Sequence, residues 1–321
     1  MSEREIVCGN LAQAIDDFRR EGFRLDLIYP ADDPHSAILG KGADSVRLTT
    51  RPDAAAPSEA LAPFAPQFVL SRAGASGGEG RAGMLYRDLI PGRLGGRYIA
   101  SLISMPDGGP VADWVHFHRV AFQMIYVRRG WVRVVYEDQG EPFVMREGDL
   151  VLQPPRIRHR VLESSPELEV IEIGAPALHG TYADHEMELP NGSNPGRMFA
   201  GQHFLRHIAA ETTRTAYCGG EAQETATIDA TGRLAEVRTL RGDVSVAAHH
   251  GELDFGFVLD GSAKLDFGEG FDLGPGDAFV IPPSGDWRIT HSSGDFSLLQ
   301  VRTARLPGLL ISPADRLQPG P

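Results

Sequence analysis

Two histidines two positions apart, His116 and His118, are the residues of this sequence best suited to chemistry. In a β-strand, side chains two apart point to the same face, so both imidazoles can converge on one point. An amide, Gln123, and a third histidine, His159, follow along the chain. Imidazole suits divalent iron, copper, nickel and zinc, and three imidazoles with a weak amide leave coordination positions open. The spacing of His116 and His118 therefore predicts a metal site, for which His159 and Gln123 are candidate further ligands.

A basic residue, Arg158, directly precedes the third histidine. A guanidinium can bind a carboxylate through two parallel hydrogen bonds, so we predict that Arg158 binds the anionic group of a substrate. Gln123 is the second predicted catalytic residue, either as a weak fourth ligand or as a hydrogen-bond partner of bound water or substrate. Because position 123 carries an amide and not a carboxylate, the site is expected to be poor in carboxylates. The lack of negative charge favours the binding of an anionic substrate.

The elements that must position these residues are short strands. The 321 residues include 37 glycines and 23 prolines, with runs rich in Val, Leu and Ile between them, which is typical of a mainly β chain. Strand-like runs cover residues 97–103, 123–127, 131–136, 150–152 and 168–173. In a small β-barrel alternate residues face the interior, which would bring the histidines together.

The same pattern occurs a second time. EGDLVLQPP at residues 147–155 is followed later by GPGDAFVIPP at residues 274–283, and Gly130 has a counterpart in Gly261. A repeat with the offset that separates Gly130 from Gly261 indicates two copies of one domain, because solenoid repeats are much shorter.

The second copy has lost the histidine set. Aligned on the repeat, the positions of His116, His118, Gln123 and His159 become Ala247, His249, Asp254 and Trp287. We therefore predict that the second copy is structural, with Trp287 filling its interior. Residues 249–254 (HHGELD) are interpreted as a surface loop rather than a displaced metal site.

The first 50 residues predict a separate βαβββ module. Strands are expected at residues 5–8, 23–29, 36–39 and 45–49, with a helix between the first two that begins after Asn10 and ends at Gly22. The phrase GFRLDLIYPADDPHSAILGKG resembles one half of a glyoxalase/bleomycin-resistance (vicinal oxygen chelate) domain. In that family the first and last strands carry ligands; here they offer Cys8 and Thr49 or Thr50, which implies a metal-free module. A lone unit leaves a sheet edge open, and a second copy of the chain covering it predicts a homodimer.

The histidine motif itself resembles the two sequence motifs of the cupin superfamily. His116, His118 and His159 match the three histidine ligands, and Gln123 stands where the family usually has Glu. Pro154-Pro155-Arg156 replaces the usual P-x-G. The resemblance implies two cupin barrels (double-stranded β-helix, or jelly-roll), of which the first binds metal.

These inferences divide the chain into six parts. They are residues 1–50, the βαβββ module; 51–82, a linker with a strand near 67–70; 83–176, the first barrel; 177–218, a connection with a short helix near 204–210; 219–305, the degenerate second barrel; and 306–321, a tail.

The layout is similar to that of gentisate-type ring-cleaving dioxygenases. That similarity implies one Fe(II) per chain and an Fe(II) dioxygenase that cleaves a small anionic aromatic or diketone substrate with O2. The first alternative is a non-oxidative isomerase, hydrolase or lyase that uses Zn, Mn or Ni as a Lewis acid. The second is a non-catalytic protein that binds a small molecule.

Composition restricts the partners. The formal net charge of -12 argues against nucleic acid or anionic lipid as a ligand. Two cysteines far apart make no disulfide framework and no Cys-based zinc site. The N-terminus is charged and no apolar run approaches the ~18 residues that span a bilayer, so a cytoplasmic protein without a membrane partner is expected.

Overall fold

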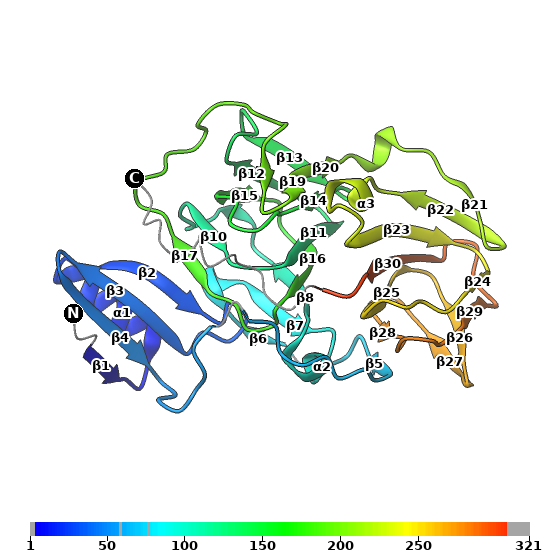
Figure 1. Cartoon of the computed structure of the whole chain (residues 1–321), viewed down its shortest axis with the longest axis horizontal. Coiled ribbons are helices and arrows are strands. Elements are labelled where there is room, and N and C mark those ends of the chain that lie inside the picture. Colours follow the sequence, from blue (N-terminus) through cyan, green and yellow to red (C-terminus); the bar gives the residue numbers. More distant parts are fainter. Residues whose placement is uncertain (1–3, 58–59, 76, 307–321) are drawn as a thin grey trace.

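Three packed parts follow one another along the chain in the computed structural model, which describes residues 4–57, 60–75 and 77–306. Figure 1 shows an N-terminal module in blue, a first barrel from cyan to green and a second barrel from yellow to red. The predicted mainly β class is confirmed. The predicted tail lies outside the described residues, apart from the buried Leu306. In the part of the chain that the structure describes, no helix is long and apolar enough to cross a membrane.

The N-terminal module has the predicted βαβββ order. Its elements are β1 (Arg4–Val7), α1 (Leu11–Arg20), β2 (Arg24–Tyr29), β3 (Ser36–Lys41) and β4 (Asp44–Thr49). The side chain of Asn10 accepts a hydrogen bond from the Gln13 backbone N–H, which confirms the predicted N-cap. Helix α1 places Leu11 and Ile15 against the sheet, in a small core of its own.

One sheet edge of this module is covered by the same chain. Strand β17 (Thr181–Ala183) pairs with β2 on one side and with β10 (His116–His118) of the first barrel on the other. The module and half of the first barrel therefore share one 10-stranded sheet. The argument for a homodimer does not apply to this edge, and the homodimer stays a prediction.

The first barrel consists of two facing antiparallel sheets. One contains β17, β10, β15 (His159–Ser164), β12 (Trp131–Tyr136), β13 (Phe143–Arg146) and β9 (Gly109–Pro110). The other contains β20 (Leu205–His207), β14 (Leu150–Leu152), β11 (Phe122–Arg129), β16 (Leu168–Ala175), β8 (Ile99–Met105), β7 (Leu85–Asp88) and β6 (Gly78–Glu79). Short pieces nearby are the 3-10 turn η1 (Arg81–Gly83), α2 (Arg93–Gly96), β18 (Met198–Phe199) and β19 (Gln202–His203).

The second barrel repeats this plan. One sheet contains β21 (Thr215–Tyr217), β22 (Gly220–Glu224), β23 (Ala235–Arg241), β30 (Ser297–Thr303), β25 (Leu253–Asp260), β28 (Ala278–Val280) and β5 (Val69–Ser71). The other contains β24 (Val244–Val246), β29 (Trp287–Thr290), β26 (Ala263–Phe267) and β27 (Glu269–Leu273), and the turns η2 (Ala209–Glu211) and α3 (Thr227–Ala230) precede β23.

Each barrel takes one edge strand from the segment that precedes the other barrel. β5, which lies before the first barrel in the sequence, pairs with β28, and β20, which lies before the second, pairs with β14. The helix predicted near residues 204–210 is therefore wrong. The open edge of β14 offers backbone partners that hold residues 205–207 extended.

A buried ion pair links the two barrels. Arg97, next to β8, donates two hydrogen bonds to the Glu252 carboxylate, of 2.8 and 2.7 Å, and Tyr98 donates a third. The expected surface loop at residues 249–254 is thus wrong, because His249, Glu252 and Asp254 are all buried. Their polar groups pair with residues distant in sequence, which the local pattern did not reveal.

Candidate metal centre

Two neighbouring strands bring the three predicted histidines together. His116 and His118 lie on β10, and His116 is the direct partner of His159 across the pairing of β10 with β15. The ring centroids of His116 and His159 are 4.2 Å apart. One ligand nitrogen from each of the three histidines lies within 4.8 Å of the others. Within residues 4–57, 60–75 and 77–306 no other group of His, Cys, Asp or Glu forms such a cluster.

Backbone carbonyls fix the orientation of all three rings. The Nδ1 atoms of His116, His118 and His159 lie 2.8, 3.1 and 3.1 Å from the carbonyl oxygens of Trp114, Gly180 and Ile157. A carbonyl accepts a hydrogen bond, so each Nδ1 carries the proton and each Nε2 keeps a lone pair. This second contact is how metal-binding histidines are usually held.

Burial keeps these rings neutral. As whole residues, His116, His118 and His159 are 1%, 7% and 5% exposed. Burial lowers the pKa of His159 to about 4, and burial together with the neighbouring imidazoles lowers the pKa of His116 and His118 well below the usual value. At neutral pH the three Nε2 atoms are therefore ready to bind a cation without losing protons.

The fourth predicted ligand, Gln123, faces the same interior but is held by a neighbour. Its Nε2 donates a hydrogen bond of 2.5 Å to Glu172 Oε1 on β16. Only the amide oxygen remains to act as a ligand or an acceptor. The expectation of a carboxylate-poor site is corrected by Glu172, which lines the same cavity. Glu172 lies two residues after Val170 on a strand whose alternate residues face the cavity. This alternation is the sequence signal from which Glu172 could have been predicted.

A charged pair that the sequence did not reveal lies beside His116. Arg81 of η1 donates a 2.7 Å hydrogen bond to Asp113, and both side chains are buried. Asp113 also accepts from the Val161 backbone N–H, and its Oδ1 lies 3.4 Å from His116 Nδ1. Arg81 comes from the stretch interpreted as a linker, so only the tertiary fold brings it here.

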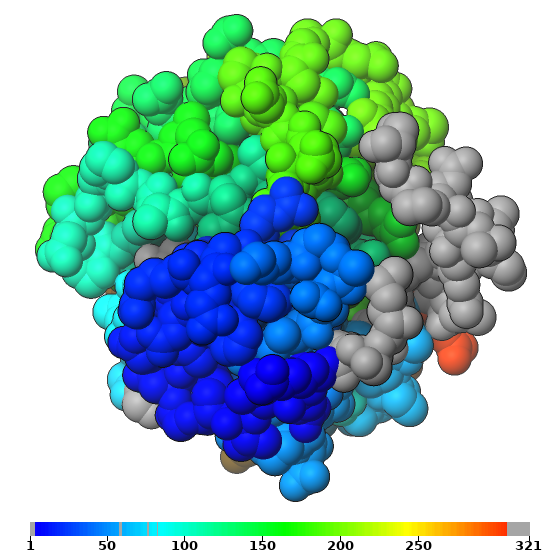
Figure 2. Space-filling model, turned by 90° about the vertical axis from the view of Figure 1, so that its left-hand side faces the viewer, coloured from blue at the N-terminus to red at the C-terminus, as the bar shows by residue number. Residues whose placement is uncertain are grey.

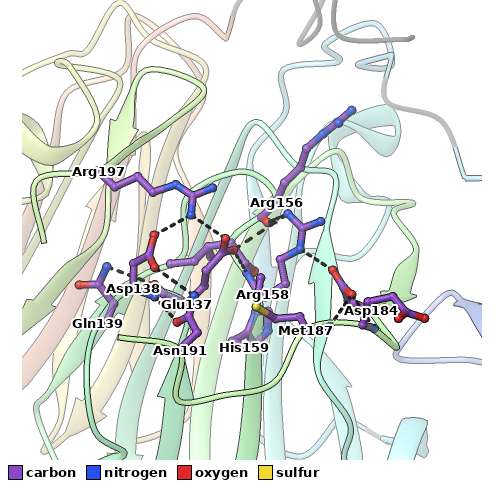
Figure 3. Close-up of polar contacts among 12 residues, drawn as sticks. Glu137, Asp138, Gln139, Arg156, Arg158, His159, Asp184, Met187, Asn191 and Arg197 are labelled. Atoms are coloured by element: carbon purple, nitrogen blue, oxygen red, sulfur yellow. Dashed lines mark hydrogen bonds and ion pairs between the residues drawn. The ribbon is translucent and has the colours of Figure 1, made fainter. Parts of the chain in front are cut away.

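The predicted anion-binding Arg158 is placed elsewhere. Its Nε donates to Asp184, 2.9 Å away, and its guanidinium stacks on Phe117. Figure 3 shows it in a polar network that also joins Arg197 to Glu137. This network ties the chain after β17 to the first barrel. Arg158 thus positions the backbone beside His159, and it is not among the residues that line the cavity.

The histidines line a cavity of about 90 Å³ inside the first barrel. Most of its wall is apolar. Besides Tyr86 and Tyr136, its polar members are Arg81, His116, His118, Gln123, Gln153, His159 and Glu172. Tyr136 stacks on His159 and accepts a hydrogen bond from Gln153. The N-terminal module contributes Ala31 to the wall.

The equivalent interior of the second barrel is filled. Trp287 is buried and its Nε1 donates to Asp254, as the predicted filling of the interior requires. Gln300 and Arg302 also donate to Asp254. His249 points its Nε2 toward the Ile281 carbonyl instead. The alignment of the repeats thus identified which residues replace the ligands.

The donor set of the first barrel fits a divalent transition metal. Three neutral imidazoles with oriented Nε2 atoms, the amide oxygen of Gln123 and a mostly apolar wall meet the requirements of a catalytic site. These donors suit Fe, Mn, Ni, Cu and Zn, so they indicate a metal without selecting one.

Comparison with known proteins agrees with this architecture. Residues 101–174 match the family model described as Cupin domain. The protein Ylba of E. coli superimposes with a TM-score of 0.55 and 13% identity, covering 77% of this chain and 94% of that one. A putative glyoxylate-induced protein from Pseudomonas aeruginosa gives 0.55 and 13%, covering 78% and 95%. An oxalate decarboxylase mutant of Bacillus subtilis gives 0.54 and 14%, covering 77% and 80%. A search of the curated proteins finds no match by sequence.

At these identities the similarity shows the fold, and it confirms the predicted cupin jelly-roll. The resemblance of residues 1–50 to a vicinal-oxygen-chelate unit has no support among these comparisons and stays a prediction.

Proposed function

We propose that this protein is a metal-dependent enzyme in which His116, His118 and His159 hold one divalent ion, Fe(II) in first place. The observation that carries the proposal is the tripod of buried, neutral imidazoles whose Nε2 atoms face one cavity. The ion would supply open coordination positions where a substrate oxygen and O2 meet. The proposed reaction is cleavage of a small anionic substrate with both atoms of O2 entering the products.

Cavity size narrows the substrate class. An engineered apolar cavity that binds benzene measures about 150 Å³, whereas this cavity measures about 90 Å³. Of the two predicted substrate classes, a small diketone fits better than an aromatic ring. The apolar side chains around the polar residues of the cavity exclude bulk water and strengthen electrostatic contacts with such a substrate.

Glu172 favours a second candidate, which is non-oxidative cleavage of a small dicarboxylate. Its carboxylate lines the cavity close to Gln123 and can carry a proton to or from a substrate. One protein of similar fold is an oxalate decarboxylase. Here the metal would be Mn, Ni or Zn, and no O2 would be consumed in net terms. The third candidate is a non-catalytic protein that binds such an acid.

Metal analysis of protein purified without added metal, followed by activity measurements, separates the three candidates. Iron together with O2 uptake that depends on a small diketone supports the first, and zinc without O2 uptake excludes it. Release of CO2 from oxalate without net O2 uptake supports the second. Absence of metal, with ligand binding unchanged in His116→Ala, supports the third. Cytoplasmic location and the homodimer remain predictions beside these proposals.

A further inference from the structure

Arg81 lies at the boundary between the metal cavity and a larger cleft. The cleft, of about 530 Å³, separates helix α1 of the N-terminal module from the first barrel. Figure 2 shows the module (blue) packed over this side of the molecule. Residues of the cleft include Asn10, Ile15, Arg19, Glu79, Ala112 and Trp114, together with Arg81. Arg81 is the charged side chain that lines both spaces, although it is only 8% exposed.

The N-terminal module holds Arg81 in this position. The Arg81 backbone N–H donates a 2.9 Å hydrogen bond to the carbonyl of Ala31, which itself lines the metal cavity. The guanidinium stacks on Trp114 at 5.3 Å from the ring centroid. The module is thus part of the wall of the site.

The guanidinium of Arg81 has more hydrogen-bond donors than the surrounding residues offer acceptors. Nη1 donates to Asp113, but Nε is buried without any partner. Nη2 has only a long contact of 3.5 Å with His116 Nε2. That nitrogen has one lone pair, which a bound metal would take. With metal in place, Arg81 would therefore keep buried N–H groups without acceptors beside the metal position, and an unpaired buried donor is costly.

We propose that Arg81 binds the carboxylate of the substrate next to the metal, and that the substrate enters through the cleft between the N-terminal module and the first barrel. The inference rests on the proposed function, because the anion is bound between Arg81 and the histidine-held ion. A carboxylate supplies the acceptors that the buried N–H groups lack, in the two-bond geometry that guanidinium favours. The established pairing of Arg81 with Asp113 keeps the guanidinium oriented toward the cavity in the absence of ligand.

The binding role is tested with the Co(II)-loaded protein and oxalate as the probe. The visible absorption of Co(II) reports both metal binding and the approach of an anion. We expect Arg81→Gln to keep the cobalt spectrum and to raise the oxalate Kd on the order of 10- to 100-fold, as expected for loss of a charge-assisted contact. Arg206→Gln, an exposed arginine on β20, is the charge-matched control and should bind oxalate like the wild type. An unchanged Kd in Arg81→Gln would overturn the assignment.

Removal of Arg81 leaves Asp113 buried without its cation, so folding must be controlled. The double variant Arg81→Gln/Asp113→Asn keeps this pair neutral and should show the same loss of oxalate affinity. Arg81→Lys keeps the charge but not the two-bond geometry, and we expect an intermediate Kd. Wild-type affinity in the folded double variant would contradict the proposal.

The entry route is tested by obstruction. Ala112 is exposed on the cleft wall, so Ala112→Trp should fill the cleft without disturbing a core. We expect the rate of oxalate association to fall at least about tenfold, while the same change at the exposed Ala216 of β21 has no effect. An unchanged association rate in Ala112→Trp would show that substrate enters elsewhere. Failure of the wild type to bind Co(II) would instead refute the proposed function, so the two failures are distinguishable.

Discussion

Gln123 Nε2 lies 2.5 Å from Glu172 Oε1, and this contact determines what the amide can do. The amide nitrogen donates to the carboxylate, so only the amide oxygen is available to the metal position. A Glu at position 123 would place a second carboxylate against Glu172. The amide and Glu172 therefore form a matched pair, and the carboxylate of this site stands on β16 rather than on β11.

The first prediction concerns this pair. Gln123→Glu brings two carboxylates into contact in a half-buried site, so one should stay protonated with a raised pKa. We expect the variant to be less stable than the wild type at pH 8, and the difference to shrink near pH 5 as the pair takes up a proton. Urea denaturation at both pH values measures this. The exchanged variant Gln123→Glu/Glu172→Gln should recover most of the loss, and equal destabilisation of both variants would contradict the pairing.

The second prediction concerns metal binding. His116→Ala, His118→Ala and His159→Ala should each lower metal affinity by at least about 100-fold, because each removes a ligand. His249→Ala, which changes the one histidine that the second barrel retains at an equivalent position, should leave the stoichiometry at one ion per chain. Metal titration with a competing chelator measures both. A second ion lost in His249→Ala would show that the second barrel also binds metal.

The third prediction is a pH dependence of metal-free protein. Burial lowers the pKa of His159 to about 4 in the folded chain, whereas an unfolded histidine titrates near 6.5. Between these values the unfolded state binds more protons, so stability falls as pH decreases from 6.5 to 4. The contribution of this one group is about 3 kcal/mol. His159→Leu should show a shallower decline over this interval, and parallel curves would contradict the assignment.

The fourth prediction links the N-terminal module to the site through Gly80. A Cβ at Gly80 would lie 2.6 Å from the Ala31 carbonyl oxygen and 2.5 Å from the Tyr86 ring. Gly80→Ala should therefore cost about 1–3 kcal/mol and displace the Arg81 segment, which weakens anion binding. Gly78→Ala is the matched control, because a Cβ there meets nothing within 4 Å. Denaturation and oxalate titration measure the two effects. Equal behaviour of the two variants would show that Ala31 and Tyr86 yield without disturbing Arg81.

The fifth prediction concerns the second barrel. Asp254→Ala removes the acceptor of Trp287, Gln300 and Arg302, which leaves a half-buried cation without its counter-ion and two buried donors unpaired. We expect a loss of about 3–5 kcal/mol. Metal content of the remaining folded protein should not change, since we predict that this barrel is structural. Loss of bound metal in this variant, measured on the folded fraction, would contradict that role.

Much of this molecule follows from local sequence alone. Alternation of apolar residues placed most of the strands, the N-cap at Asn10 placed the helix, and the spacing of His116 and His118 placed two ligands on one strand face. These features depend on residues a few positions apart, where strand and helix geometry leave little freedom. The repeat also predicted that Trp287 occupies the vacated interior, because aligned positions in copies of one fold occupy equivalent places.

Tertiary structure alone decided which charged groups meet at the site. Arg81, Asp113 and Glu172 come from three separate segments, and Arg81 reaches the cavity because its turn is hydrogen-bonded to Ala31 of the N-terminal module. By contrast, Arg158 adjoins His159 in sequence but points away from the cavity, toward Asp184. Arg158 precedes β15, which begins at His159, and its ion pair with Asp184 holds the side chain away from the cavity. Pairing of buried charges depends on contacts between distant segments, which no local pattern records.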